Sequence, residues 1–335
     1  MEISVESFLE YAVMAGATDL ILAEGLVPAV RIASNTYAIP DAPVIPLGTL
    51  EKFTGPLPDE SGVFCGGPWC HYHWRVQYSR EAFGRMACFR LLTAECPDLA
   101  SLGAPGSVQN LLHLGSGLVI FAGPSASGKT MTASSFVSAY SQVRVCRAAF
   151  LEPLQEYNLN FGESLVQMRR PKIEMASEIK QGLLNGTDLF WLGNLSSEFF
   201  IAALKAAEAG SLVVGTANGG SIAGVFDSIV AAEPAANQSL LRSLLAYNLK
   251  AVVFQRTVPM ASGEGSVCLW EVLYNNPTVS SLIRSGEHYK FSQVIAAGAA
   301  EGMHSMDLSL AAAVKSGQIS REEAKRFAFD ESQLG

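Results

Sequence analysis

The chain has 335 residues and a formal net charge of −8, and 49% of it is apolar. This length is sufficient for two domains with large buried cores. An acidic balance argues against a protein that wraps nucleic acid, because such proteins normally present a basic face to the phosphates. No window holds roughly 18 uninterrupted apolar residues, so we expect no membrane span.

The beginning of the chain and its cysteines both favour the cytoplasm. The first residues include Glu2, Glu6 and Glu10 and no basic segment, so we expect no secretory signal peptide. The six cysteines are scattered along the chain. A chain with a large core does not need disulfides, and a reducing compartment is therefore the better expectation.

Residues 1–100 are predicted to form a small α+β domain. Apolar residues fall at helical spacing near the start, at Val5, Phe8, Leu9 and Val13, and predict an amphipathic helix. The segment 19–32 then predicts two short strands around a glycine-containing turn, and further strand-like segments follow.

The stretch "CGGPWCHYH" (Cys65–His73) predicts a β-hairpin whose turn is formed by residues 66–68. His71 and His73 would then alternate onto one face of the returning strand. Cys70, His71 and His73 are also possible metal ligands. The usual zinc pattern pairs a close cysteine couple with a distant second couple, and no such second couple is evident, so the hairpin is favoured.

A segment containing glycine, proline and serine predicts a linker at 101–109, followed by a larger domain at 110–335. Three short apolar runs in that domain have the composition of strands, at 117–123, 188–195 and 211–218. Helical patterns lie between them. Strands that alternate with helices predict an α/β fold, a parallel sheet with helices on both faces.

The segment "GPSASGKT" fits the pattern G-x-x-x-x-G-K-[ST] of a phosphate-binding loop, with a buried strand before it and a helix after it. Glycines allow successive N–H groups to point at phosphate oxygens, and the helix N-terminus adds its positive end. The lysine is expected to reach the β- and γ-phosphates of ATP, and the threonine to bind Mg²⁺. The predicted nucleotide-binding residues are Gly123, Pro124, Ser125, Ala126, Ser127, Gly128, Lys129 and Thr130.

The segment "AALKAAEAGSLVVGTANGGSIAGVFDSIV" (202–230) resembles the core of type IV pilus retraction ATPases of the PilT/PilU type, within the type II/IV secretion ATPase superfamily. "GMHSMDLSL" and "GQISREEA" near the end resemble further family segments, and the order is collinear along nearly the whole chain. The resemblance implies a PAS-like N-terminal domain followed by a RecA-like P-loop NTPase domain with a helical C-terminal part. It also implies homo- or hetero-hexameric rings at the cytoplasmic face of the inner membrane, where a pilus platform protein is the partner.

The sequence departs from this family at the positions that carry its chemistry. The Walker B glutamate position is Asn194, the acidic-box glutamate position is Gln155, and the family's histidine position is Asn218. Ser228 stands where the family usually has arginine. A carboxylate can take a proton from water or hold Mg²⁺ through water, whereas a neutral amide has neither the charge nor the basicity.

The remaining candidates for catalysis are Glu152 and Glu156, and the candidates for Mg²⁺ are Thr130 and Asn194. Glu156 follows the aligned position by one residue, which on a regular strand turns a side chain to the opposite face. Two hypotheses remain open. The chain is an ATP-binding ring subunit with impaired hydrolysis, or it is an inactive pseudo-ATPase that regulates or co-assembles with an active pilus or secretion ATPase.

Overall fold

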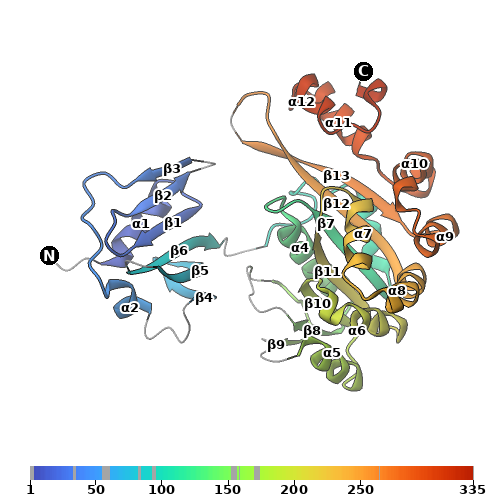
Figure 1. The fold of residues 1–335 in the computed structure, drawn as a ribbon, viewed down its shortest axis with the longest axis horizontal. Helices are drawn as coiled ribbons and strands as arrows, with labels where there is room; N and C mark the ends of the chain where they lie inside the picture. The colour runs from blue at the N-terminus through green and yellow to red at the C-terminus, as the bar shows by residue number, and fades with distance from the viewer. Residues whose placement is uncertain are drawn as a thin grey trace. The chain divides into compact units, whose positions relative to one another are not determined.

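The structure is a computed structural model that describes residues 4–32, 35–54, 61–81, 84–92, 96–151, 157, 159–169, 174–263 and 265–334. The chain forms two compact units, the first spanning Met1–Glu95 and the second beginning at Cys96 (Figure 1). The domain limits 1–100, 101–109 and 110–335 stay a prediction. No helix in the described part of the chain has the length and apolarity of a membrane span.

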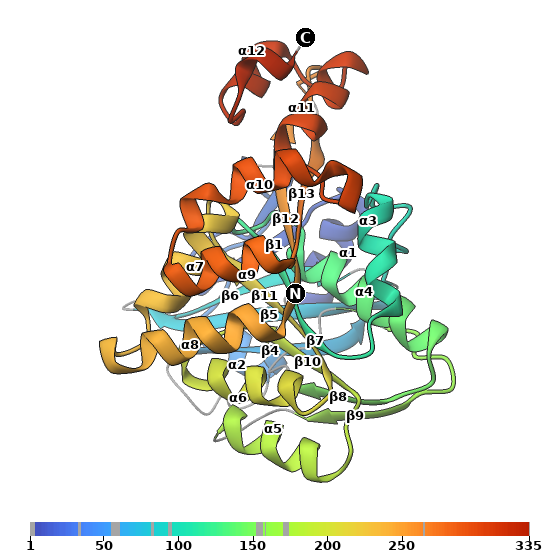
Figure 2. The ribbon, with the colours of Figure 1, turned by 90° about the vertical axis from the view of Figure 1, so that its right-hand side faces the viewer.

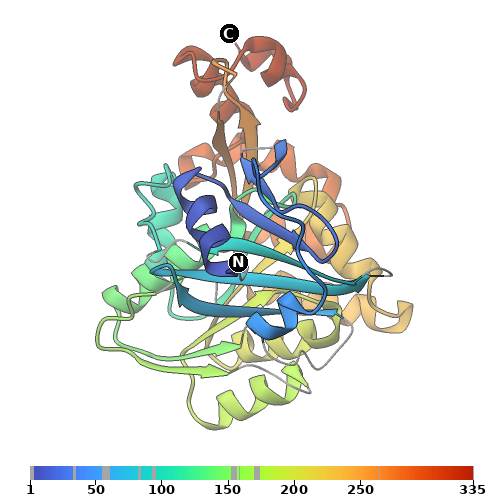
Figure 3. The same ribbon diagram turned by 90° about the vertical axis from the view of Figure 1, so that its left-hand side faces the viewer.

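The first unit is a six-stranded antiparallel sheet with the strand order β3-β2-β1-β6-β5-β4 (Figure 3). Helix α1 buries Val5, Leu9 and Ala12, which join an apolar cluster with Leu20 and Phe89 of the sheet. The predicted amphipathic helix and the α+β, PAS-like class are therefore confirmed. The elements are α1 (Val5–Met14), β1 (Asp19–Ala23), β2 (Ala29–Ile32), β3 (Asn35–Ala38), α2 (Thr49–Thr54), β4 (Ser61–Trp69), β5 (Tyr72–Glu81) and β6 (Gly84–Leu92).

The predicted hairpin between β4 and β5 is present, but its turn lies at Cys70 and His71 rather than at residues 66–68. Both turn residues have positive φ, 53° and 67°, as a two-residue hairpin turn of type I′ requires. His71 is therefore a turn residue and does not alternate with His73 on a strand. Among the residues that the structure describes, no group of three or more His, Cys, Asp or Glu could hold a metal ion.

The second unit is built on a seven-stranded sheet with the order β13-β12-β7-β11-β10-β8-β9. Neighbouring strands are parallel except for β13, which pairs antiparallel with β12 at one edge. The predicted parallel sheet is therefore confirmed. The strands are β7 (Gly117–Gly123), β8 (Arg147–Leu151), β9 (Leu165–Arg169), β10 (Leu189–Asn194), β11 (Leu212–Asn218), β12 (Leu249–Pro259) and β13 (Ser266–Tyr274).

Helices cover both faces of this sheet, as Figure 2 shows with α4 on one side and α6, α7 and α8 on the other. Helix α4 buries Phe136 and Tyr140 against Phe121 of the central strand β7. Phe200 of α6 and Phe226 of α7 lie in the cluster on the opposite face. The helices are α3 (Gly106–Asn110), α4 (Lys129–Val143), α5 (Met175–Leu184), α6 (Ser197–Glu208), α7 (Ile222–Ala231), α8 (Ala235–Asn248), α9 (Pro277–Ser285), α10 (Phe291–Ala297), α11 (Met306–Lys315) and α12 (Arg321–Lys325).

The edge strand β13 carries a carboxyl group that contacts the C-terminal helices. The Glu271 carboxylate accepts a hydrogen bond from the N–H of Met306, the first residue of α11. Burial raises the pKa of Glu271 to about 7. The Met306 bond and Arg256 oppose that rise, and the nearby carboxylate of Asp307 adds to it. The ionised form is therefore disfavoured where β13 meets α11.

We predict that Glu271→Gln stabilises the chain at about pH 8. The carboxyl ionises near 4.5 in the unfolded chain and near 7 in the folded one. As the pH rises between these values, the unfolded state loses its proton first, so the unfolding free energy falls by roughly 3 kcal/mol. Glutamine keeps the acceptor for the Met306 N–H and removes this loss. Urea unfolding at about pH 5 and about pH 8 measures the difference.

The exposed carboxylate of Glu163 provides the control, because Glu163→Gln removes the same charge away from α11. The control variant should keep the pH dependence of the wild type. Equal pH profiles for Glu271→Gln and the wild type would contradict the assignment of Glu271 as the group that titrates.

Candidate functional site

The predicted phosphate loop connects the end of β7 to the start of α4 in a tightly wound backbone. Gly123 and Gly128 have φ of 152° and 85°, and Ala126 has φ of 62°, which residues other than glycine seldom adopt. A Cβ at Gly123 would lie 2.2 Å from the carbonyl oxygen of Gln255 on the neighbouring strand β12. Backbone strain of this kind persists where the surrounding structure imposes it, and it is common at ligand-binding loops.

The polar side chains of the loop fit a phosphate group. Lys129 is only 7% exposed, and its ammonium donates to the Pro124 carbonyl of its own loop at 2.5 Å. Burial lowers the pKa of Lys129. The Ser127 hydroxyl is buried and has no hydrogen-bond partner among the described residues. A buried cation and an unpartnered hydroxyl beside a helix N-terminus are suited to phosphate oxygens, which would supply the missing acceptors.

The strand ends next to the loop carry two carboxamides. In the parallel ladder, Asn218 at the end of β11 pairs with Gly123, and Asn194 at the end of β10 pairs with Thr216 of β11. The Gly219 N–H also donates to the Gly123 carbonyl at 3.1 Å. Ligands of α/β proteins bind at the carboxyl ends of parallel strands. The structure therefore places both asparagines at the end of the sheet where the loop lies.

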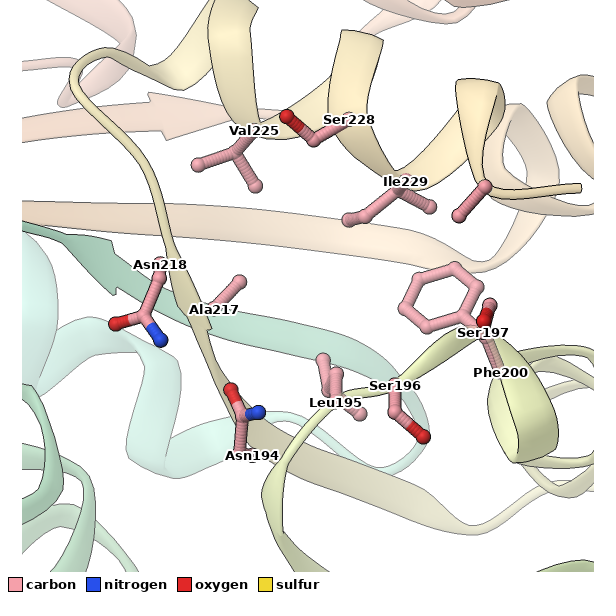
Figure 4. Close-up of a pocket in the computed structure, with 11 residues that line it drawn as sticks. Asn194, Leu195, Ser196, Ser197, Phe200, Ala217, Asn218, Val225, Ser228 and Ile229 are labelled. Carbon is pink, nitrogen blue, oxygen red and sulfur yellow. The ribbon is translucent and has the colours of Figure 1, made fainter.

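These positions share one pocket with Ser228 (Figure 4). The pocket has a volume of about 200 Å³, and in the described ranges no charged side chain lines it. Asn194 and Asn218 extend from adjacent strands at one side, and Ser228 lies on α7. The lining residues are Asn194, Leu195, Ser196, Ser197, Phe200, Ala217, Asn218, Val225, Ser228, Ile229 and Ala232.

Other predicted site residues are placed less directly. Thr130 follows Lys129 in the first turn of α4 and is partly buried, so its predicted role in Mg²⁺ binding stays a prediction. Glu152, Gln155 and Glu156 lie outside the described residues. Asp188, which directly precedes β10, lies at the opposite end of that strand from Asn194. Its carboxylate accepts from the Arg147 N–H at 2.9 Å, which is a structural contact between neighbouring strands.

Sequence reasoning missed a residue beneath the loop. Gln255 is 2% exposed, and its Nε2 donates to Thr132 Oγ1 of α4 at 2.9 Å and to Cys268 Sγ at 3.3 Å. The signal that was available is a lone amide within the apolar strand "AVVFQ" (251–255), because a buried polar side chain needs partners.

We predict that Gly123→Ala lowers the free energy of unfolding by about 3 kcal/mol, because the new Cβ must displace backbone that cannot move aside. Gly220→Ala is the matched control in the neighbouring loop, since a Cβ there meets nothing within 4 Å. We expect the control to change stability by less than about 0.5 kcal/mol. Thermal unfolding of both variants measures this, and similar losses in the two would contradict the close approach.

Comparisons with known proteins agree with the fold. No model of a known protein family matches the chain. The chain is 30% identical over 257 residues to the twitching motility protein of Neisseria gonorrhoeae, covering 76% of this chain and 69% of that protein. It is 25% identical over 337 residues to the type IV pilus retraction ATPase PilT of Pseudomonas aeruginosa, covering 96% and 97% of the two chains.

A solved structure of the pilus retraction motor PilT with bound ADP superimposes with a TM-score of 0.85 at 27% identity. The superposition covers 99% of both chains, so it includes the antiparallel N-terminal unit as well as the parallel sheet. The chain belongs to the family of type IV pilus retraction ATPases.

Proposed function

We propose that this chain is an ATP-binding, ring-forming subunit of a type IV pilus machine whose capacity for hydrolysis is impaired. The observation that carries the proposal is the contrast between a cation and neutral amides at the carboxyl ends of neighbouring strands. The loop keeps a buried Lys129 ammonium, while the strand ends beside it present the carboxamides of Asn194 and Asn218. The related PilT structure contains ADP, which supports a nucleotide as the ligand of the loop.

The chain supplies groups that hold a triphosphate. The backbone N–H groups of 123–130 and the Lys129 ammonium would bind phosphate oxygens, and the Thr130 hydroxyl with water at Asn194 would hold Mg²⁺. A bound Mg²⁺ neutralises charge on the β- and γ-phosphates. Neither carboxamide can accept a proton from water at neutral pH. Hydrolysis then depends on Glu152 or Glu156, which are the carboxylates that the acidic box retains.

The missing charges have a large expected effect on rate. Stabilisation of a phosphoryl-transfer transition state comes mostly from positioned charge. Loss of the group that orients water raises the barrier by several kcal/mol, and each 1.4 kcal/mol slows the reaction about tenfold. Binding does not need that group. The residues therefore favour a subunit that retains nucleotide much longer than an active motor does.

Membership of the family also suggests the oligomer, the cellular location and the partner of the subunit. We place the subunit in a homo- or hetero-hexamer at the cytoplasmic side of the inner membrane, bound to a pilus platform protein. The uncharged pocket of Asn194, Asn218 and Ser228 favours a second candidate function. In that function the chain is a pseudo-ATPase, and a bound nucleotide orders it for assembly with an active family member.

We predict saturable ATP binding in the micromolar range with only slow turnover, measured by calorimetry and phosphate release on the same preparation. Lys129→Ala should weaken ATP binding by about tenfold or more, because it removes the cation from the phosphates. Size-exclusion chromatography with nucleotide shows whether a ring has assembled. Turnover that disappears in Lys129→Ala would reject the pseudo-ATPase, whereas ATP binding without turnover by the assembled wild type would reject slow hydrolysis.

A restored variant separates lost chemistry from a damaged fold. Asn194→Glu, Gln155→Glu and Asn218→His together return the family's residue types. If positioned charge is what the chain lacks, the triple variant should hydrolyse ATP at least about tenfold faster than the wild type with similar affinity.

A further inference from the structure

The amide of Gln255 joins the first turn of the phosphate-loop helix to the edge of the sheet. Its Nε2 donates to Thr132 of α4 and to Cys268 of β13, so one side chain connects three elements. Its Oε1 is buried and has no hydrogen-bond partner in the described part of the chain. An unpaired buried oxygen is costly, and a small movement of the loop that brings a donor to it is therefore favourable.

The loop has a reason to move when it takes a phosphate. Lys129 donates to the Pro124 carbonyl, and phosphate oxygens would compete with that carbonyl for the ammonium. Ser127 is buried beside Gly123, and its hydroxyl also has no hydrogen-bond partner among the described residues. Binding at the loop thus rearranges hydrogen bonds within one helical turn of Thr132, to which Gln255 is attached.

The opposite end of the connection is a helix in the C-terminal part of the chain. Gln255 pairs across β12 and β13 with Trp270. The Trp270 N–H donates to Ser309 Oγ of α11 at 3.2 Å, and Ser309 Oγ donates to the Trp270 carbonyl at 2.7 Å. His304 Nε2 lies 2.8 Å from the same hydroxyl. The buried hydroxyl of Ser309 therefore bonds to the backbone N–H and C=O of β13, as the backbone of a neighbouring strand would.

We propose that Gln255 is a positioning residue that couples phosphate binding at the loop to the stability of α11. The coupling path contains Thr132, Gln255, Trp270 and Ser309, which are all buried. Each step is a side-chain hydrogen bond or a register pair within the same compact unit. The inference rests on the proposed function only in naming ATP as the ligand that supplies the phosphate.

The connection is tested first without nucleotide, by hydrogen exchange of the full chain analysed by mass spectrometry. Gln255→Met keeps the length and apolar volume of the side chain and removes the amide. We expect amide exchange in 306–315 to become about fivefold faster, since α11 loses support from its edge strand. Exchange in α1 of the first unit should not change, which controls for general destabilisation.

The second measurement adds ATP. In the wild type, saturating ATP should slow exchange in 306–315 by about tenfold, which corresponds to a coupling in the usual range. In Gln255→Met, ATP should still bind, and the change in 306–315 should be less than about twofold. Loss of binding in Lys129→Ala should remove the effect entirely.

Reciprocity provides a test from the helix side, because coupled sites change each other's affinity by the same factor. Ser309→Ala should weaken ATP binding by about tenfold. Ser316→Ala is the matched control, since among the described residues the Ser316 hydroxyl donates to Ala313 of its own helix and not to β13. Equal ATP affinities for these two variants would overturn the proposal.

The outcomes separate this inference from the proposed function. If Gln255→Met leaves exchange in 306–315 unchanged without nucleotide, the connection itself is wrong, whatever the chain binds. If that exchange changes but the wild type binds no ATP, the connection stands and the proposed function fails. If ATP binds and 306–315 does not respond, the coupling is wrong and the proposed function stands.

Discussion

The parallel pairing of β7, β11 and β10 is the constraint on which the site depends. Because all three strands run in the same direction, their carboxyl ends meet at one edge, and register places Asn218 beside Gly123. The loop that follows β7 can then wind closely over β12, where only a glycine leaves room for the Gln255 carbonyl. Side chains far apart in sequence become neighbours because backbone hydrogen bonds align the strands.

The electrostatics of that end of the sheet suit binding better than hydrolysis. A buried ammonium faces the loop, and no charged side chain lines the adjacent pocket in the described residues. Cations favour phosphate binding, whereas hydrolysis also needs a group that orients and deprotonates water. The chain has the cation for binding, and the strand ends beside it carry carboxamides, which cannot deprotonate water. This contrast is the physical basis for proposing binding with impaired turnover. The same neutrality lowers the desolvation cost of packing an uncharged surface against the pocket.

The edge strand β13 links this site to the C-terminal helices through polar contacts. Ser309 bonds to Trp270 on one side of the strand pair, and Glu271 bonds to the first residue of α11. An edge strand has unpaired N–H and C=O groups, and here α11 and the segment before it satisfy some of them, as the bridge between Val272 and His304 also shows. The position of α11 is therefore sensitive both to protonation of Glu271 and to the strand that lies beneath the phosphate loop.

The sequence by itself determined the local features of the fold. An apolar run ending in Gly123 predicted β7 because a strand buried on both faces needs continuous apolar side chains, and the loop pattern followed from the backbone freedom of glycine. The family resemblance predicted the two-part architecture. The hairpin turn was misplaced because Cys70 and His71 adopt positive φ without being glycine, a preference that composition does not reveal.

Only the tertiary structure decided which residues meet. Asn194, Asn218 and Ser228 are separated along the chain, and strand register together with the packing of α7 brings them to one pocket. Gln255 gains its role from contacts with α4 and β13, which no pattern within β12 encodes. Local propensity and periodicity act over a few residues, whereas a site is made by long-range packing, and packing depends on the whole chain at once.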